Sequence, residues 1–141
     1  MRQPPKGFRP EPYEYHQELT LRVENLTNLG QGIARDGKWV VQVSQVLPGE
    51  LIRARIFRNH KNYSAADCLE VLESSPAREM PVCSLYGTCG GCQYQHVAYA
   101  TQLDWKRLHV EECLERIGGI EVRVSPTIAS PKPYGYRSKL T

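Results

Sequence analysis

The sequence lacks an apolar run long enough to cross a membrane, and its first residues do not have the pattern of a secretory signal peptide. Over 141 residues, no hydrophobic stretch approaches the ~20 residues that a membrane span requires. The opening MRQPPKGFRPEPYEY is polar and proline-rich, without the apolar centre of a signal peptide. We therefore expect a cytoplasmic monomer with no membrane partner, and a disordered lead-in over residues 1–15.

The number and placement of the cysteines do not fit a disulfide framework. Five cysteines are an odd number, and three of them crowd one loop. In a reducing compartment, such thiols are better explained by metal ligation or redox chemistry. The first half of the sequence also lacks the pattern of a long helix. We therefore expect it to fold from short strands.

Residues 16–75 carry the pattern of a small β-barrel. In LTLRVENL, apolar and polar residues alternate with the period of a half-buried strand. The Asp36-Gly37 pair suits a two-residue hairpin, and Pro48-Gly49 marks a further turn. About five short strands follow one another here, which predicts a barrel of the oligonucleotide-binding (OB) type, although an SH3-like barrel has the same spacing.

Basic residues gather in this barrel segment. The whole chain has a net charge of only +3, but from Ile33 to Tyr63 six cations face two carboxylates, a local charge of +4. The cations are Arg35, Lys38, Arg53, Arg55, Arg58 and Lys61.

A cysteine-rich loop follows over residues 76–98. Cys83, Cys89 and Cys92 form the pattern C-x5-C-G-G-C, in which Gly90 and Gly91 permit a tight backbone. Clustered thiolates select zinc, copper(I) or an iron–sulfur cluster. The alternatives are buried, unliganded thiols in a turn, or a Cys3His zinc site completed by His96. Cys68 lies inside a strand pattern and Cys113 lies on the apolar face of the predicted helix, so we expect both in the core.

Residues 99–141 predict a helix and an incomplete continuation. Thr101 and Asp104 suit a helix start, Gly118 suits its end, and one stripe is apolar: Leu103, Val110, Leu114 and Ile117. The tail EVRVSPTIASPKPYGYRSKLT resembles a strand, a turn and the start of another strand. The fold class is therefore mainly β: a barrel, a cysteine loop, one helix and the start of an α+β domain.

The motifs together resemble the bacterial RNA uracil-5-methyltransferases, which include 23S rRNA and tRNA enzymes. The resemblance lies in PVCSLYGTCGGCQYQH, in the helix opening QLDWK, and in GQGIARDGK and VLPGELIRARI, which are similar to the TRAM domain of that family. YGYRSK resembles the Y-R-N-K opening of the family's central RNA-binding domain, with Ser138 where asparagine is usual.

The resemblance implies that Cys83, Cys89 and Cys92 are three ligands of a 4Fe–4S cluster, with the fourth downstream of Thr141 and His96 only a neighbour. It implies methyl transfer from S-adenosylmethionine to carbon 5 of a uracil in rRNA or tRNA. No residue here matches the family's nucleophile or base, and no glycine-rich cofactor turn is present, so we expect no catalytic residue in this segment. The spacing differs from the C-x3-C-x2-C of radical S-adenosylmethionine enzymes.

RNA binding by the barrel is the hypothesis that follows. Its six cations would track phosphates, and Trp39, Phe57 and Tyr63 would offer platforms on which unpaired bases stack. The alternative is that these charges form a solvated face and that Trp39 and Phe57 belong to the core.

Overall fold

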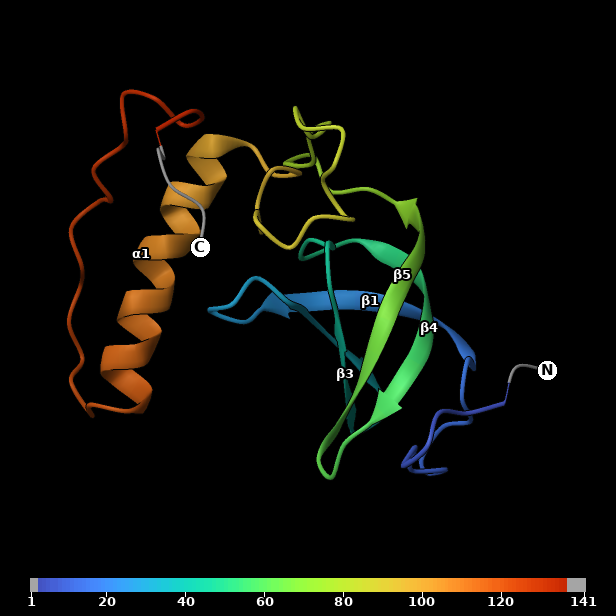
Figure 1. Cartoon of the computed structure of the whole chain (residues 1–141). Helices are drawn as coiled ribbons and strands as arrows, with labels where there is room; N and C mark the ends of the chain where they lie inside the picture. The colour runs from blue at the N-terminus through green and yellow to red at the C-terminus, as the bar shows by residue number, and fades with distance from the viewer. Residues whose placement is uncertain (1–2, 137–141) are drawn as a thin grey trace. The chain divides into compact units, whose positions relative to one another are not determined.

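Five strands close into a barrel in this structure, a computed structural model that describes residues 3–136. The strands are β1 (Glu18–Leu26), β2 (Gly32–Asp36), β3 (Trp39–Val43), β4 (Leu51–Asn59) and β5 (Tyr63–Glu73). Their order around the barrel is β1-β2-β3-β5-β4, and all neighbours are antiparallel except β3 and β5 (Figure 1). The predicted fold class, a small OB-like barrel followed by one helix, is confirmed.

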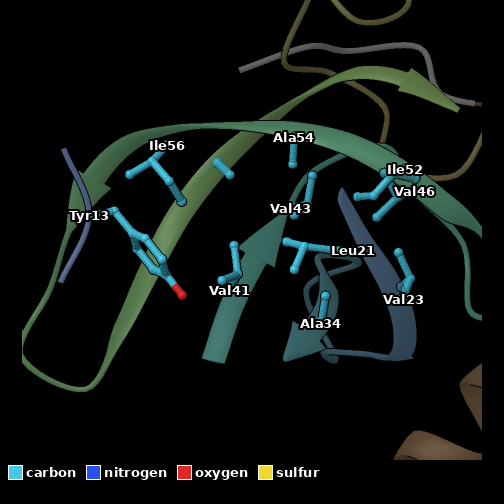
Figure 2. Packing of buried hydrophobic residues seen from close by; sticks show 11 residues of the cluster. Tyr13, Leu21, Val23, Ala34, Val41, Val43, Val46, Ile52, Ala54 and Ile56 are labelled. Carbon is cyan, nitrogen blue, oxygen red and sulfur yellow. The ribbon is translucent and has the colours of Figure 1, made fainter. Parts of the chain in front are cut away.

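The interior of the barrel is filled by the apolar residues of the alternating strands. On β4, Ile52, Ala54 and Ile56 are fully buried, while Arg53 between them faces outward. The inner residues of the other strands point toward the same centre (Figure 2). Each fully buried Val, Leu or Ile contributes roughly 1.5–3 kcal/mol, so this core is the main source of stability.

Glycine turns connect the strands much as the sequence predicts. Asp36 pairs with Trp39, so the two central residues of the hairpin are Gly37 and Lys38, one residue later than the predicted Asp36-Gly37 pair, and Gly37 has φ 58°. Gly49 has φ 87° in the turn before β4. Positive φ is accessible to glycine without steric cost, which is why these turns are short.

The predicted disordered lead-in is corrected for the residues that precede β1. Tyr13 is 7% exposed and belongs to the core, and its hydroxyl donates a hydrogen bond to Asp36. Asn59 donates to the backbone oxygens of Arg9 and Tyr13. An isolated tyrosine in a polar, proline-rich run gives no periodic signal, so the sequence did not indicate this packing.

Helix α1 (Tyr99–Arg116) begins and ends at other residues than the sequence predicts. Its N-cap is Ala98, with no side-chain cap, and the left-handed residue after its end is Gly119 instead of Gly118. The chain divides into two compact units, Met1–His96 and Val97–Thr141, and the helix belongs to the second. Among the described residues, no helix is both long and apolar enough to span a membrane.

The tail after α1 is extended but forms no strand within the described residues, which corrects the predicted strand. It runs back along the helix and is tied to it by hydrogen bonds from Val124 to Glu111, from Thr127 to Leu103 and from Ser130 to Tyr99. Arg137, Ser138 and Lys139 of the YGYRSK motif lie outside the described residues.

Candidate functional site

Two consecutive turns shape the cysteine loop. The amide of Tyr86 donates to the Cys83 oxygen at 3.1 Å, and the amide of Cys89 donates to the Leu85 oxygen at 2.8 Å. Gly87 takes the left-handed conformation at φ 91°, whereas Gly90 and Gly91 do not. The role predicted for Gly90 and Gly91 is therefore corrected: Gly87 makes the tight turn. A Cβ on Gly91 would lie 3.4 Å from the sulfur of Cys89.

The three thiols of the loop are all exposed, and two of them share a pocket. Cys89 and Cys92 line a pocket of about 270 Å³, together with residues of the barrel loops, whereas Cys83 does not line it. Among the described residues, no three His, Cys, Asp or Glu side chains are close enough together to hold a metal ion. The thiols thus have the right donor chemistry for a soft metal, but the described residues do not bring three such ligands together.

His96 is buried, whereas the three thiols are exposed. Its side chain is 1% exposed, its Nδ1 contacts the Tyr86 hydroxyl, and the two rings lie 5.4 Å apart. Burial lowers the pKa of His96 to about 4, with a further lowering by the positive charge of Arg78, so the ring is neutral at pH 7. His96 does not line the pocket with Cys89 and Cys92, although Tyr86, which it contacts, does.

A buried ion pair anchors the base of the loop to the barrel. Glu50 is fully buried and accepts hydrogen bonds from Arg78 Nε at 2.6 Å and Nη2 at 2.7 Å. The amides of Leu47 and Ser75 also donate to this carboxylate. Its burial alone would raise the pKa of Glu50, but the hydrogen bonds from Arg78 and the two amides lower it. Arg78 also donates to the Gln45 backbone oxygen.

Two further contacts involve the cysteine loop. The Glu79 amide donates to the His96 backbone oxygen at 3.0 Å, which closes the loop on itself. A Cβ on Gly30 would lie 3.1 Å from the ring of Tyr94, so the β1–β2 turn and the end of the loop pack closely. The sequence did not reveal Glu50 or Arg78, because a charged residue beside a turn usually faces solvent.

The six predicted RNA-binding cations divide into two groups of three. Arg35 pairs with Glu24 at 3.3 Å, Arg55 with Asp67 at 3.3 Å, and Arg53 with Glu70 at 3.0 Å. The other three cations are exposed and form no ion pair with any described residue: Lys38, Arg58 and Lys61. The structure therefore does not bring all six together as one free basic face.

The three candidate stacking residues differ in their exposure and contacts. Trp39 packs against the core and donates from Nε1 to the Ser64 hydroxyl at 2.9 Å, as the core alternative predicts. Phe57 is 40% exposed, so the core alternative is wrong for it. Tyr63 is half-buried and stacks on His60 with ring centres 4.3 Å apart.

The two remaining cysteines differ from each other. Cys68 on β5 packs against the core, as predicted, and burial raises the pKa of its thiol. Cys113 on α1 is exposed, so its predicted core position is wrong. Two residues of its predicted apolar stripe, Val110 and Ile117, are exposed as well.

The chain is similar in sequence to RNA methyltransferases. No family model matches it. It is 36% identical over 132 residues to an uncharacterized RNA methyltransferase of Clostridium acetobutylicum, covering 92% of this chain. It is 40% identical over 124 residues to one of Thermosynechococcus vestitus, covering 87% of this chain. The chain is homologous to a segment of these RNA methyltransferases. The predicted family resemblance is thereby confirmed at the level of RNA methyltransferases.

The homologous segment is short relative to these proteins. The chain spans 29% of the Clostridium methyltransferase and 28% of the Thermosynechococcus one. Among solved structures, it is similar to a Pyrococcus abyssi tRNA (uracil-54, C5)-methyltransferase in complex with S-adenosyl-L-homocysteine, with 30% identity and a TM-score of 0.46. That match covers 79% of this chain and 24% of the other.

Proposed function

We propose that this chain is the RNA-binding and cluster-binding segment of an S-adenosylmethionine-dependent RNA (uracil-C5) methyltransferase. The observation that carries the proposal is homology to RNA methyltransferases over 92% of the chain. The closed five-stranded barrel adds support, because barrels of this type commonly bind single-stranded nucleic acid. The substrate would be a cytoplasmic RNA, ribosomal or transfer.

The cysteine loop would hold a 4Fe–4S cluster through Cys83, Cys89 and Cys92. Thiolates are the ligands such clusters use, and Cys89 and Cys92 already line one pocket. Cluster binding would have to draw in Cys83, and a fourth ligand would come from outside these residues. When bound, a cluster cross-links the loop, because the binding free energy of a metal site is also folding free energy. His96 would not be a ligand, since its ring is buried beside Tyr86.

The methyl transfer itself would require residues outside this segment. Chemistry at carbon 5 of uracil needs a nucleophile, a base and a fold that binds S-adenosylmethionine. Nothing in the sequence matches those parts, so the isolated chain should bind RNA without methylating it. Incubation with labelled S-adenosylmethionine and uracil-containing RNA should leave the RNA unlabelled, and labelling above background would refute this assignment.

RNA binding by the barrel is tested separately, by fluorescence anisotropy with a labelled single-stranded RNA. If three or four cations neutralise phosphates, the logarithm of the affinity should fall against the logarithm of salt concentration with a slope of ~−2 to −3. Binding that does not respond to salt, or no binding at low salt, would contradict the RNA-binding part of the proposal.

A further inference from the structure

The outward face of β1, β4 and β5 is neutralised by its own carboxylates. Arg53 lies between Glu18 at 3.6 Å and Glu70 at 3.0 Å, and Arg55 pairs with Asp67 at 3.3 Å. Arg22 pairs with Glu73 at 2.7 Å, and beside this face Arg35 pairs with Glu24 at 3.3 Å. Four arginines thus meet five carboxylates, so these pairs carry no net positive charge for a polyanion.

The unpaired cations lie at one end of the barrel. Val40 at the start of β3 pairs with Tyr63 at the start of β5, in parallel. The β2–β3 turn, with Lys38, and the β4–β5 turn, with Lys61, therefore lie side by side. Arg58 on β4 is next to Asn59, which pairs with Ser64. We call this the hairpin-tip surface: Arg9, Lys38, Arg58, Lys61, His60 and Tyr63.

A network of hydrogen bonds fixes this end of the barrel. Trp39 Nε1 donates to Ser64, the Ser64 hydroxyl donates to Asn59, and Asn59 donates to the backbone oxygens of Arg9 and Tyr13. The links tie both hairpin turns and the segment before β1 into one rigid support, and Figure 1 shows that segment beside the same end of the barrel as the β4–β5 turn.

Three carboxylates also occur here, and they leave the surface positive. Asp36 accepts the Tyr13 hydroxyl at 2.9 Å, and Glu11 and Glu14 are exposed on the segment before β1. Burial, with the hydrogen bond to Asp36, raises the pKa of Tyr13 to about 12, so this hydroxyl stays a donor. None of the three forms an ion pair with a cation of the described residues. The four cations of this surface are thus free to contact phosphates: Arg9, Lys38, Arg58 and Lys61.

Aromatic rings accompany these cations. His60 and Tyr63 stack with their ring centres 4.3 Å apart, and Phe57 is 40% exposed on the neighbouring strand. On the segment before β1, Tyr15 stacks on His16 at 3.9 Å and meets Phe8 edge-on at 5.2 Å. Free cations beside partly exposed rings are the combination that binds the backbone and the bases of single-stranded nucleic acid.

We propose that single-stranded RNA contacts the barrel at the hairpin-tip surface and not along the paired arginines of its strands. This inference rests on the proposed function, since it locates the RNA-binding site of that function. Arg35, Arg53 and Arg55 would have to leave carboxylates before meeting phosphates, whereas Lys38, Arg58 and Lys61 need break nothing. Lys38, Arg58 and Lys61 therefore supply the phosphate contacts.

Two triple variants of the whole chain test the location. Lys38→Ala/Arg58→Ala/Lys61→Ala removes three unpaired charges, and Arg35→Ala/Arg53→Ala/Arg55→Ala removes three paired ones. Both lower the net charge by three, so long-range attraction falls equally. Affinity for a labelled single-stranded RNA is measured by anisotropy over a range of salt concentrations, and circular dichroism checks folding.

The first variant should bind RNA at least about tenfold more weakly, and its salt slope should be shallower by ~2, because each phosphate contact contributes ~0.7. The second should change affinity by less than about threefold. Equal or larger loss in the second variant overturns the location while RNA binding itself stands. If the wild-type chain binds no RNA, the proposed function fails and the location fails with it.

A second readout on the wild-type chain does not depend on any variant folding. RNA containing 4-thiouridine is crosslinked by ultraviolet light, and the attached peptides are identified by mass spectrometry. Crosslinks should fall on His60 in the β4–β5 turn and on Tyr63 at the start of β5. Crosslinks confined to the outward face of β1, or to peptides outside residues 3–73, would overturn the proposal.

Discussion

Replacing Arg78 by methionine should destabilise the barrel much more than the same replacement at an exposed arginine. Arg78 has a side chain only 25% exposed, and it donates twice to Glu50, whose side chain is 0% exposed. Without Arg78, the carboxylate stays buried with only the amides of Leu47 and Ser75. Removing one partner of a buried ion pair costs roughly 3–5 kcal/mol, and partial solvent access to Arg78 favours the lower end.

The melting temperature offers a direct measure of this loss. For a domain of 60–100 residues, 1 kcal/mol shifts the melting temperature by roughly 4–8 °C, so Arg78→Met should lower it by ~12–24 °C. Arg53→Met is the matched control, because Arg53 also has two carboxylate partners, but it is 47% exposed and Glu70 54%. Exposed pairs contribute about 0–1 kcal/mol, so the control should melt within a few degrees of the wild type.

The dependence on pH gives the same prediction a second test. The folded pKa of Glu50 is lowered, mainly by Arg78 working against the effect of burial. Its contribution is therefore fully present above the unfolded carboxyl pKa of ~4.3 and is lost as the pH falls through the lower folded value. The difference between wild type and Arg78→Met should shrink as the pH falls, beginning above ~4.3, because burial without Arg78 favours the protonated carboxyl of Glu50 in the folded variant. A difference under about 1 kcal/mol at pH 7, or one that does not depend on pH, would refute the anchor.

Further predictions concern the cysteine loop and the residues that contact it. Gly30→Ala should lower the free energy of unfolding by about 1–2 kcal/mol in urea, because Gly30 has φ 78° and a Cβ there would lie 3.1 Å from the Tyr94 ring. The control Gly90→Ala should leave the free energy of unfolding unchanged, because Gly90 has open space and no positive φ. Because His96 has a folded pKa of about 4, below the ~6.5 of an unfolded histidine, wild-type stability should fall as the pH drops from ~6.5 toward 4. His96→Phe should lack that part of the pH dependence in thermal unfolding; an unchanged pH profile would contradict its neutral burial.

The barrel could be predicted from the sequence because its information is local. Strand alternation and the Asp36-Gly37 pair specify strands and turns without reference to distant residues. The helix was predictable too, but its ends were not. Thr101 offers a capping pattern that the chain does not use, since the helix already begins at Tyr99. Competing starts within one turn differ little in free energy, so sequence cannot rank them.

The contacts that organise the candidate sites depend on residues far apart in sequence. Glu50 and Arg78 are 28 residues apart, and Tyr13 and Asp36 are 23 apart. A count of basic residues likewise cannot say which arginines meet carboxylates across a sheet. The three cysteines were found by their spacing, but spacing alone did not show that Cys89 and Cys92 line a pocket that Cys83 does not line.

Metal analysis after anaerobic reconstitution tests the central claim most directly. The chain is incubated with ferrous iron and sulfide, and with zinc in a parallel sample, and then assayed for bound iron, acid-labile sulfide and zinc. The account predicts that the wild type and His96→Ala bind iron and sulfide alike, and that Cys83→Ser, Cys89→Ser and Cys92→Ser bind neither. Air-stable, stoichiometric zinc without sulfide in the wild type, lost in His96→Ala, would contradict the cluster and establish a Cys3His zinc site instead.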